Sequence, residues 1–175
     1  NNVKIFILFP LNRVSEIQRK QMTTVKKKNV FNIAVKGNFD DCQRMVKNYF
    51  KLNNKNKKIN LAAANSINWV RIMGQIVYYF WSYFRVSNRL DPMSFVVPSG
   101  NFGNAYAGYI SKKMGLPIKK IIIGSNKNDI LTRFFKTGKM KIKKTLTSLS
   151  PSMDIQVSSN FERLLFDFYE NGKMI

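Results

Sequence analysis

Two glycines lie close together near the middle of the chain, in the stretch Ser99-Gly100-Asn101-Phe102-Gly103-Asn104. An apolar run at residues 94–97 precedes them, and a helical pattern follows. Glycine accepts positive φ, so consecutive N–H groups of such a loop can converge on one point at a helix start. An anion, and phosphate above all, suits that point. The loop is therefore a candidate phosphate site, although a glycine pair after a strand is also typical of a plain tight turn.

This loop requires a strand before it and a helix after it, and the chain predicts both within a regular alternation. Apolar runs predict strands at residues 3–9, 30–35, 94–97 and 119–123, with a short segment at 59–63 in the corresponding place before the third helix. Helical spacing predicts helices at residues 15–22, 40–50, 67–84, 104–114, 128–135 and 161–169. Alternation of this kind predicts an α/β fold with parallel strands, in which ligands bind beyond the carboxyl ends of the strands. The glycine loop lies at such an end.

Polar residues mark the starts of several predicted helices. Ser15, with Gln18 three residues later, predicts a capping box, and Asn65-Ser66 predicts the cap of the long third helix. Ser158 or Ser159 is the expected cap of the last helix. These signals fix the helix starts more closely than the apolar pattern alone.

The composition is that of a folded globular chain with a strongly basic balance. Of 175 residues, 45% are hydrophobic and 22% charged, which excludes a disordered or fibrous protein. The net charge of +21 would fit a nucleic acid or an anionic membrane. The lysines, however, lie in separate runs at residues 26–28, 55–58 and 139–144, and heavy use of Lys, Asn, Ile and Phe together indicates a bias of the encoding genome. We expect no specific nucleic-acid partner, and keep a non-enzymatic basic nucleic-acid-binding protein as an alternative.

Missing residue types exclude several kinds of site. The chain has no histidine, so it contains no Ser-His-Asp or Cys-His arrangement and no histidine-based metal site, and we expect no metal. Cys42 is the only cysteine, which predicts a reduced side chain and a cytoplasmic protein. The chain opens with Asn1 and no signal peptide, and we expect a preceding N-terminal portion.

One stretch has the length of a membrane span. Residues 67–86 are largely apolar, but Asn68, Arg71, Gln75 and Arg85 interrupt them. A charged group deep in hydrocarbon costs on the order of 3 kcal/mol. The pattern therefore predicts a long helix buried in a globular protein, and no membrane partner.

Several blocks of sequence carry a resemblance to a known family. The glycine loop is part of a stretch at residues 96–108, which runs on into Lys113-Met114-Gly115-Leu116-Pro117 and Asn126-Lys127-Asn128-Asp129; further blocks are Phe9-Pro10 and residues 37–43, 64–68 and 150–154. Together they resemble threonine synthase, a pyridoxal-phosphate enzyme, over nearly the whole chain. The resemblance implies three-layer parallel-sheet units of the tryptophan synthase β-like fold (fold type II). It implies part of a first lobe at residues 1–90, on the substrate-phosphate side, and part of a second lobe at 91–175, carrying the cofactor-phosphate loop.

The resemblance also implies two groups of site residues. The cofactor phosphate would be held by Gly100, Asn101, Phe102, Gly103 and Asn104. Many relatives have Asp at the Asn104 position, but an amide there can still cap the helix and donate to phosphate. The phosphate of the substrate would be held by Asn65, Ser66, Asn68 and Arg71, since Arg suits phosphate through its planar, bidentate donors. By themselves these four residues read as an ordinary capped helix with a surface arginine.

The implied activity is the conversion of O-phospho-L-homoserine and water to L-threonine and phosphate, in threonine biosynthesis. Pyridoxal 5'-phosphate is the implied cofactor and acts as electron sink in this carbon–oxygen lyase. The Schiff-base lysine of the family lies in a motif that no lysine here reproduces, so we assign no catalytic residue and expect this chain alone to be inactive. Another fold type II enzyme, such as a serine or threonine dehydratase, remains an alternative, and a homo-oligomer stays open. We interpret residues 37–43 as a structural strand-to-helix turn and assign residues 150–154 no role.

Overall fold

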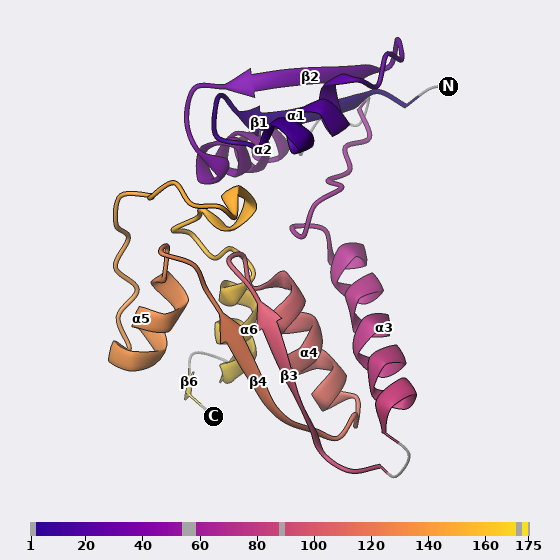
Figure 1. Ribbon diagram of the computed structural model, residues 1–175, viewed down its shortest axis with the longest axis vertical. Coiled ribbons are helices and arrows are strands. Elements are labelled where there is room, and N and C mark those ends of the chain that lie inside the picture. The colour runs from indigo at the N-terminus through magenta and orange to yellow at the C-terminus, as the bar shows by residue number, and fades with distance from the viewer. Residues whose placement is uncertain (1–2, 54–58, 88–89, 171–172, 175) are drawn as a thin grey trace. The chain divides into compact units, whose positions relative to one another are not determined.

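The computed structural model describes residues 3–53, 59–87, 90–170 and 173–174, and the chain divides into two compact units (Figure 1). Unit 1 comprises Asn1–Leu61, Asn126–Asn128 and Lys143–Gln156, and unit 2 comprises Ala62–Ser125, Asp129–Ile142 and Val157–Ile175. The lobe boundary at residue 90 that the resemblance implies stays a prediction.

Unit 1 is built on one parallel strand pair. Strand β1 (Ile5–Pro10) pairs with β2 (Val30–Val35), in a register that joins Ile5 to Val30 and Pro10 to Val35. Helix α1 (Glu16–Thr23) lies between these strands in the sequence, and α2 (Phe39–Asn53) follows them. The predicted capping box is present, because Ser15 Oγ accepts from Gln18 N at 3.2 Å and Gln18 Oε1 accepts from Ser15 N at 3.4 Å. A short 3-10 helix, η1 (Pro151–Met153), lies in the last segment of the unit.

Unit 2 carries a second parallel pair, β3 (Met93–Pro98) with β4 (Ile118–Gly124). Its helices are α3 (Trp69–Val86), α4 (Gly103–Lys113), α5 (Ile130–Thr137) and α6 (Phe161–Phe168), and a short antiparallel pair, β5 (Tyr169–Glu170) with β6 (Lys173–Met174), follows α6. Figure 1 shows α3 beside α4, and contacts between the two helices form much of the packing. Fully buried core residues include Ile72 and Tyr83 on α3, Ala105 and Ala107 on α4, Leu131 on α5 and Phe161 on α6.

Helix α4 approaches α3 through its small residues. A Cβ at Gly108 would lie 2.7 Å from the Tyr79 ring, well inside van der Waals contact. Tyr79 Oη in turn donates to Asn104 O at 2.7 Å. Burial raises the pKa of Tyr79 to about 12, so the hydroxyl keeps its proton and remains a donor. Glycine at 108 therefore lets α3 brace the start of α4.

We expect Gly108→Ala to destabilise the protein by about 1–3 kcal/mol, because the added methyl must displace the buried Tyr79 ring. Gly74→Ala is the matched control, because Gly74 lies in α3 with nothing within 4 Å of the position of an added Cβ. Alanine there should stabilise the protein by up to ~1 kcal/mol. Urea unfolding of both variants measures the difference. Equal midpoints for the two variants would contradict the close approach.

Three local predictions are wrong. Residues 59–63 form no strand, which agrees with the weak strand propensity of the alanines that end this segment. Helix α3 begins at Trp69 with Asn68 as its N-cap, rather than at Asn65-Ser66. Helix α6 has Asn160 as its N-cap, rather than the predicted Ser158 or Ser159, and the Ser159 hydroxyl donates to Asn101. Asn160 makes no side-chain cap bond, because its Oδ1 accepts from Arg163 Nε.

Helix α3 covers most of the apolar stretch at residues 67–86, which has the length of a membrane span. Among the helices in the described ranges, none is both long and apolar enough to cross a membrane. Two of its inward residues, Ile72 and Tyr83, belong to the core of unit 2.

Candidate functional site

The glycine loop leaves β3 at Pro98 and enters α4 at Gly103, as predicted, but its conformation differs from the expectation. The left-handed residue is Phe102, with φ of 64°, and neither Gly100 nor Gly103 has positive φ. Gly103 has another role, since a Cβ there would lie 3.0 Å from Ser66 Cβ and 3.3 Å from Asn160 Nδ2. Glycine at 103 therefore serves the close approach of three segments rather than a turn with positive φ.

Packing holds Phe102 in this unfavourable conformation. Its ring is 4% exposed and meets the ring of Phe161 edge-on, with centroids 5.0 Å apart. A left-handed conformation costs a residue other than glycine roughly 1–2 kcal/mol, which burial of a phenyl ring more than offsets. Phe102 thus anchors the loop to α6.

The backbone donors of the loop point to an anion site. Within the described parts of the chain, no hydrogen-bond acceptor pairs with the N–H groups of residues 100–104. Helix α4 contributes the positive end of its dipole at the same place. The stretch from Ser99 to Lys113 contains no acidic residue. Several unpaired donors in one loop without a local negative charge suit a phosphate.

Asn104 supports the loop through its side chain. Its Oδ1 accepts from Ser99 Oγ at 2.6 Å and from Ala105 N at 3.0 Å, and its Nδ2 donates to Pro98 O at 2.7 Å. The expected capping bond is therefore made to Ala105, although Phe102 is the N-cap residue. One N–H of the Asn104 amide is used within the loop, which leaves the other as a donor.

The second predicted group forms a turn before α3. Asn65 Oδ1 accepts from Ile67 N at 3.1 Å, and Asn68 Oδ1 accepts from Val70 N at 3.0 Å, so both side chains shape the backbone. Asn68 Nδ2 also donates to Ala63 O at 2.9 Å. Arg71 is exposed, and its side chain has no partner among the described residues. The structure does not bring Arg71 into contact with the glycine loop.

Ser66 joins the two predicted groups. Asn101 Nδ2 donates to Ser66 Oγ at 2.7 Å, and Asn160 Nδ2 donates to the same oxygen at 3.1 Å. Ser159, Asn160 and Arg163 complete this network, a role that the sequence pattern does not predict. The polar run at residues 158–160 is the available signal, but it predicts only a helix cap at Ser158 or Ser159. The near-complete burial of Ser159 and Asn160 is explained by their hydrogen bonds to Asn101 and Ser66 in other segments.

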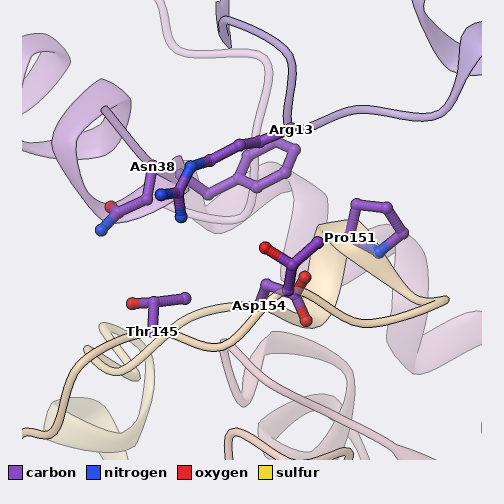
Figure 2. Close-up of a pocket in the computed structure, with 7 residues that line it drawn as sticks. Arg13, Asn38, Thr145, Pro151 and Asp154 are labelled. Atoms are coloured by element: carbon purple, nitrogen blue, oxygen red, sulfur yellow. The ribbon is translucent and has the colours of Figure 1, made fainter. Parts of the chain in front are cut away.

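A polar pocket lies within unit 1. Figure 2 shows Arg13 and Asn38 on one side of it and Thr145 and Asp154 on the other; Phe39, Thr147 and Pro151 also line it. Asp154 is 8% exposed and accepts from Asn126, Asn128 and twice from Ser148. The carboxylate therefore stabilises the segment that contains it, and the block at residues 150–154 has a structural role.

The block at residues 37–43 forms the turn into α2. Asn38 N donates to Asp41 Oδ2 at 2.8 Å, and Asp41 N donates to Asn38 Oδ1 at 3.0 Å. This reciprocal pair satisfies backbone donors at the helix start. It is the structural use that the sequence predicts for this block.

These features define an α/β protein with parallel strands and a glycine loop at a strand end, and it shares this architecture with solved proteins of the pyridoxal-phosphate fold type II. The chain is homologous along its whole length to threonine synthases. It is 55% identical to threonine synthase of Pseudomonas aeruginosa over 177 aligned positions, covering 100% of this chain and 38% of that protein. Threonine synthase of Saccharomyces cerevisiae is 53% identical, and the match covers 98% of this chain and 35% of that protein. No family model matches the chain.

Solved structures agree with the sequence comparison. The crystal structure of threonine synthase from Escherichia coli matches with a TM-score of 0.88 and 36% identity, covering 99% of this chain and 41% of that one. A threonine synthase from Brucella melitensis, solved with pyridoxal phosphate bound, matches with a TM-score of 0.78 and 49% identity, covering 95% and 36%. The chain therefore spans little more than a third of the length of the relatives it matches.

Proposed function

We propose that the full-length protein is a threonine synthase, which converts O-phospho-L-homoserine and water to L-threonine and phosphate. Homology over the whole chain supports this assignment. The structural observation that carries it is the set of unpaired backbone donors at residues 100–104, in a loop whose Asn101 side chain donates to Ser66 of a second polar segment. An enzyme with a phosphorylated cofactor and a phosphorylated substrate needs two neighbouring phosphate sites.

The glycine loop fits the phosphate of pyridoxal phosphate. A phosphate with close to two negative charges requires several donors when it leaves water. Gly100, Asn101, Phe102, Gly103 and Asn104 supply backbone donors, and the adjoining sequence carries no acidic side chain. When bound, the cofactor would supply an electron sink for the chemistry at the substrate. The lysine that would hold it covalently is assigned to no residue of this chain.

The turn before α3 would bind the phosphate of the substrate. Ser66 is the member that lies against the cofactor loop, and Asn65 and Asn68 would offer the amide donors that the turn leaves over. Arg71, one turn into α3, would add a bidentate cation. The proposal also includes a cytoplasmic location, based on the single cysteine Cys42, with no nucleic-acid or membrane partner.

Arg71→Ala separates this function from that of a dehydratase of the same fold. Loss of a hydrogen-bonded pair with a charged phosphate costs about 1.5–3 kcal/mol, so KM for O-phospho-L-homoserine should rise about 10- to 100-fold. Steady-state kinetics of threonine formation by the full-length protein measures this. Arg85→Ala is the control, because Arg85 is also exposed on α3 but contacts Trp81 at the other end of the helix. Turnover of free serine, unaffected by Arg71→Ala and without threonine formation, would favour the dehydratase.

A further inference from the structure

The Ser66 hydroxyl accepts two hydrogen bonds, which limits what it can do next. Asn101 Nδ2 donates to Ser66 Oγ at 2.7 Å, and Asn160 Nδ2 donates to it at 3.1 Å. A serine hydroxyl has two acceptor lone pairs and one O–H donor. Since both lone pairs are used, Ser66 can only donate to a further group.

The orientation of both amides is fixed by groups that cannot accept. Asn101 Oδ1 accepts from Ser159 N at 2.9 Å, and a backbone N–H is only a donor, so the NH₂ of Asn101 must face Ser66. Asn160 Oδ1 accepts from Arg163 Nε at 3.1 Å, and a guanidinium has no acceptor. The NH₂ of Asn160 must therefore face Ser66 as well.

Arg163 and Asn160 are themselves held in place. Arg163 Nη2 donates to Ile67 O at 2.9 Å, in the turn that carries Ser66, and the guanidinium lies 5.7 Å from the centre of the Trp69 ring. Asn160 is 1% exposed, and its backbone N donates to Asn101 O at 3.2 Å. A buried network with its members satisfied in this way is rigid and keeps one orientation.

The proton of Ser66 is left for a ligand. In the part of the chain that the structure describes, no group accepts from the Ser66 hydroxyl, and its side chain is half-buried rather than sealed. A hydroxyl that can only donate suits an anionic oxygen, and it disfavours a ligand that offers only N–H donors. The nearest candidate is a phosphate beside the glycine loop.

We propose that Asn160, oriented by Arg163, is a positioning residue: together with Asn101 it makes the Ser66 hydroxyl an obligate donor to the phosphate of the substrate. This inference rests on the proposed function and deepens it. The same network ties the cofactor loop, through Asn101, to the substrate turn, through Ser66. Both phosphate sites are thus oriented by one buried set of hydrogen bonds.

The test is calorimetric binding of inorganic phosphate to the full-length protein loaded with pyridoxal phosphate, where the cofactor fills the glycine loop. Asn160→Asp keeps the size of the side chain, but its second oxygen would accept a hydrogen bond from the Ser66 hydroxyl and would add negative charge. Phosphate affinity should therefore fall about 100-fold. Asn160→Ala frees one lone pair of Ser66 and leaves its O–H free to donate, so phosphate affinity should fall only about threefold. Ser66→Ala should cost about tenfold. Ser111→Ala, which removes a buried hydroxyl bonded to Ala107 O, is the control and should leave affinity within about twofold.

A double-mutant cycle separates this role from simple structural support. In the Ser66→Ala background, Asn160→Asp should lower phosphate affinity only about tenfold, because no hydroxyl remains that could turn its O–H toward the new carboxylate. Equal losses for Asn160→Asp and Asn160→Ala, equal losses with and without Ser66, or no phosphate binding by the unmodified protein would overturn the inference. Urea unfolding identifies any variant that fails to fold, and Ser66→Ala then carries the comparison with Ser111→Ala. Failure of the proposed function is a separate result, seen as no threonine formation by an unmodified protein that still binds phosphate.

Discussion

Asp154→Ala is expected to destabilise unit 1 by about 3 kcal/mol or more, because it leaves several buried donors without an acceptor. The carboxylate accepts from the amides of Asn126 and Asn128 and from both the N–H and the hydroxyl of Ser148. Asn128 is 3% exposed, so water cannot replace the lost acceptor at that side chain. The segment at residues 143–156 should become less ordered in this variant, because it loses the hydrogen bonds that join it to Asn126 and Asn128.

The measurement is urea unfolding, with Asp154→Asn as the informative intermediate. Asparagine keeps one oxygen for Asn126 and Asn128 but places an NH₂ against Ser148 N, which lies 2.9 Å from the present Oδ2. The free energy of unfolding of Asp154→Asn should therefore lie between those of the unmodified protein and Asp154→Ala. Asp91→Ala is the control, since Asp91 is exposed and its removal should change stability by no more than ~0.5 kcal/mol. Unchanged stability of Asp154→Ala would contradict the role of the carboxylate.

Phe102→Ala is expected to cost about 3–5 kcal/mol, the usual loss for a buried phenyl ring, and to weaken pyridoxal phosphate binding along with stability. The ring is the anchor of the glycine loop on Phe161. Alanine loses that packing and still has to adopt φ of 64°. The loop donors then lose their fixed positions.

Phe102→Gly separates packing from backbone conformation. Glycine removes the same ring but takes positive φ at no steric cost, so this variant should be more stable than Phe102→Ala by about 1 kcal/mol. This order reverses the ordinary penalty for glycine against alanine near a helix. Urea midpoints of the two variants, each compared with Phe135→Ala at an exposed position of α5, test it. If Phe102→Gly proves less stable than Phe102→Ala, the left-handed conformation carries no cost there.

The sequence predicts elements well where the signal is local. The capping box at Ser15 and Gln18 needs only residues three apart, and the helix and strand positions follow from the spacing of apolar side chains. The segment at residues 59–63 shows the limit of this reasoning. An apolar run before a helix resembles a strand, but a strand also needs a neighbouring strand and residues that favour the pleat.

The alternating strands and helices of this chain, and a glycine loop at the end of a parallel strand, were determined by the sequence alone, because periodicity and turn chemistry act over a few residues. Only the tertiary structure decided how the loop is built. Ser66 meets Asn101 across 35 positions and Asn160 across 94. Close packing of α3, α4 and α6 brings these side chains together and leaves little room for a Cβ at residue 103. The left-handed residue of the loop is Phe102 and not a glycine. Contacts between distant segments depend on how whole elements pack, and no local pattern encodes that.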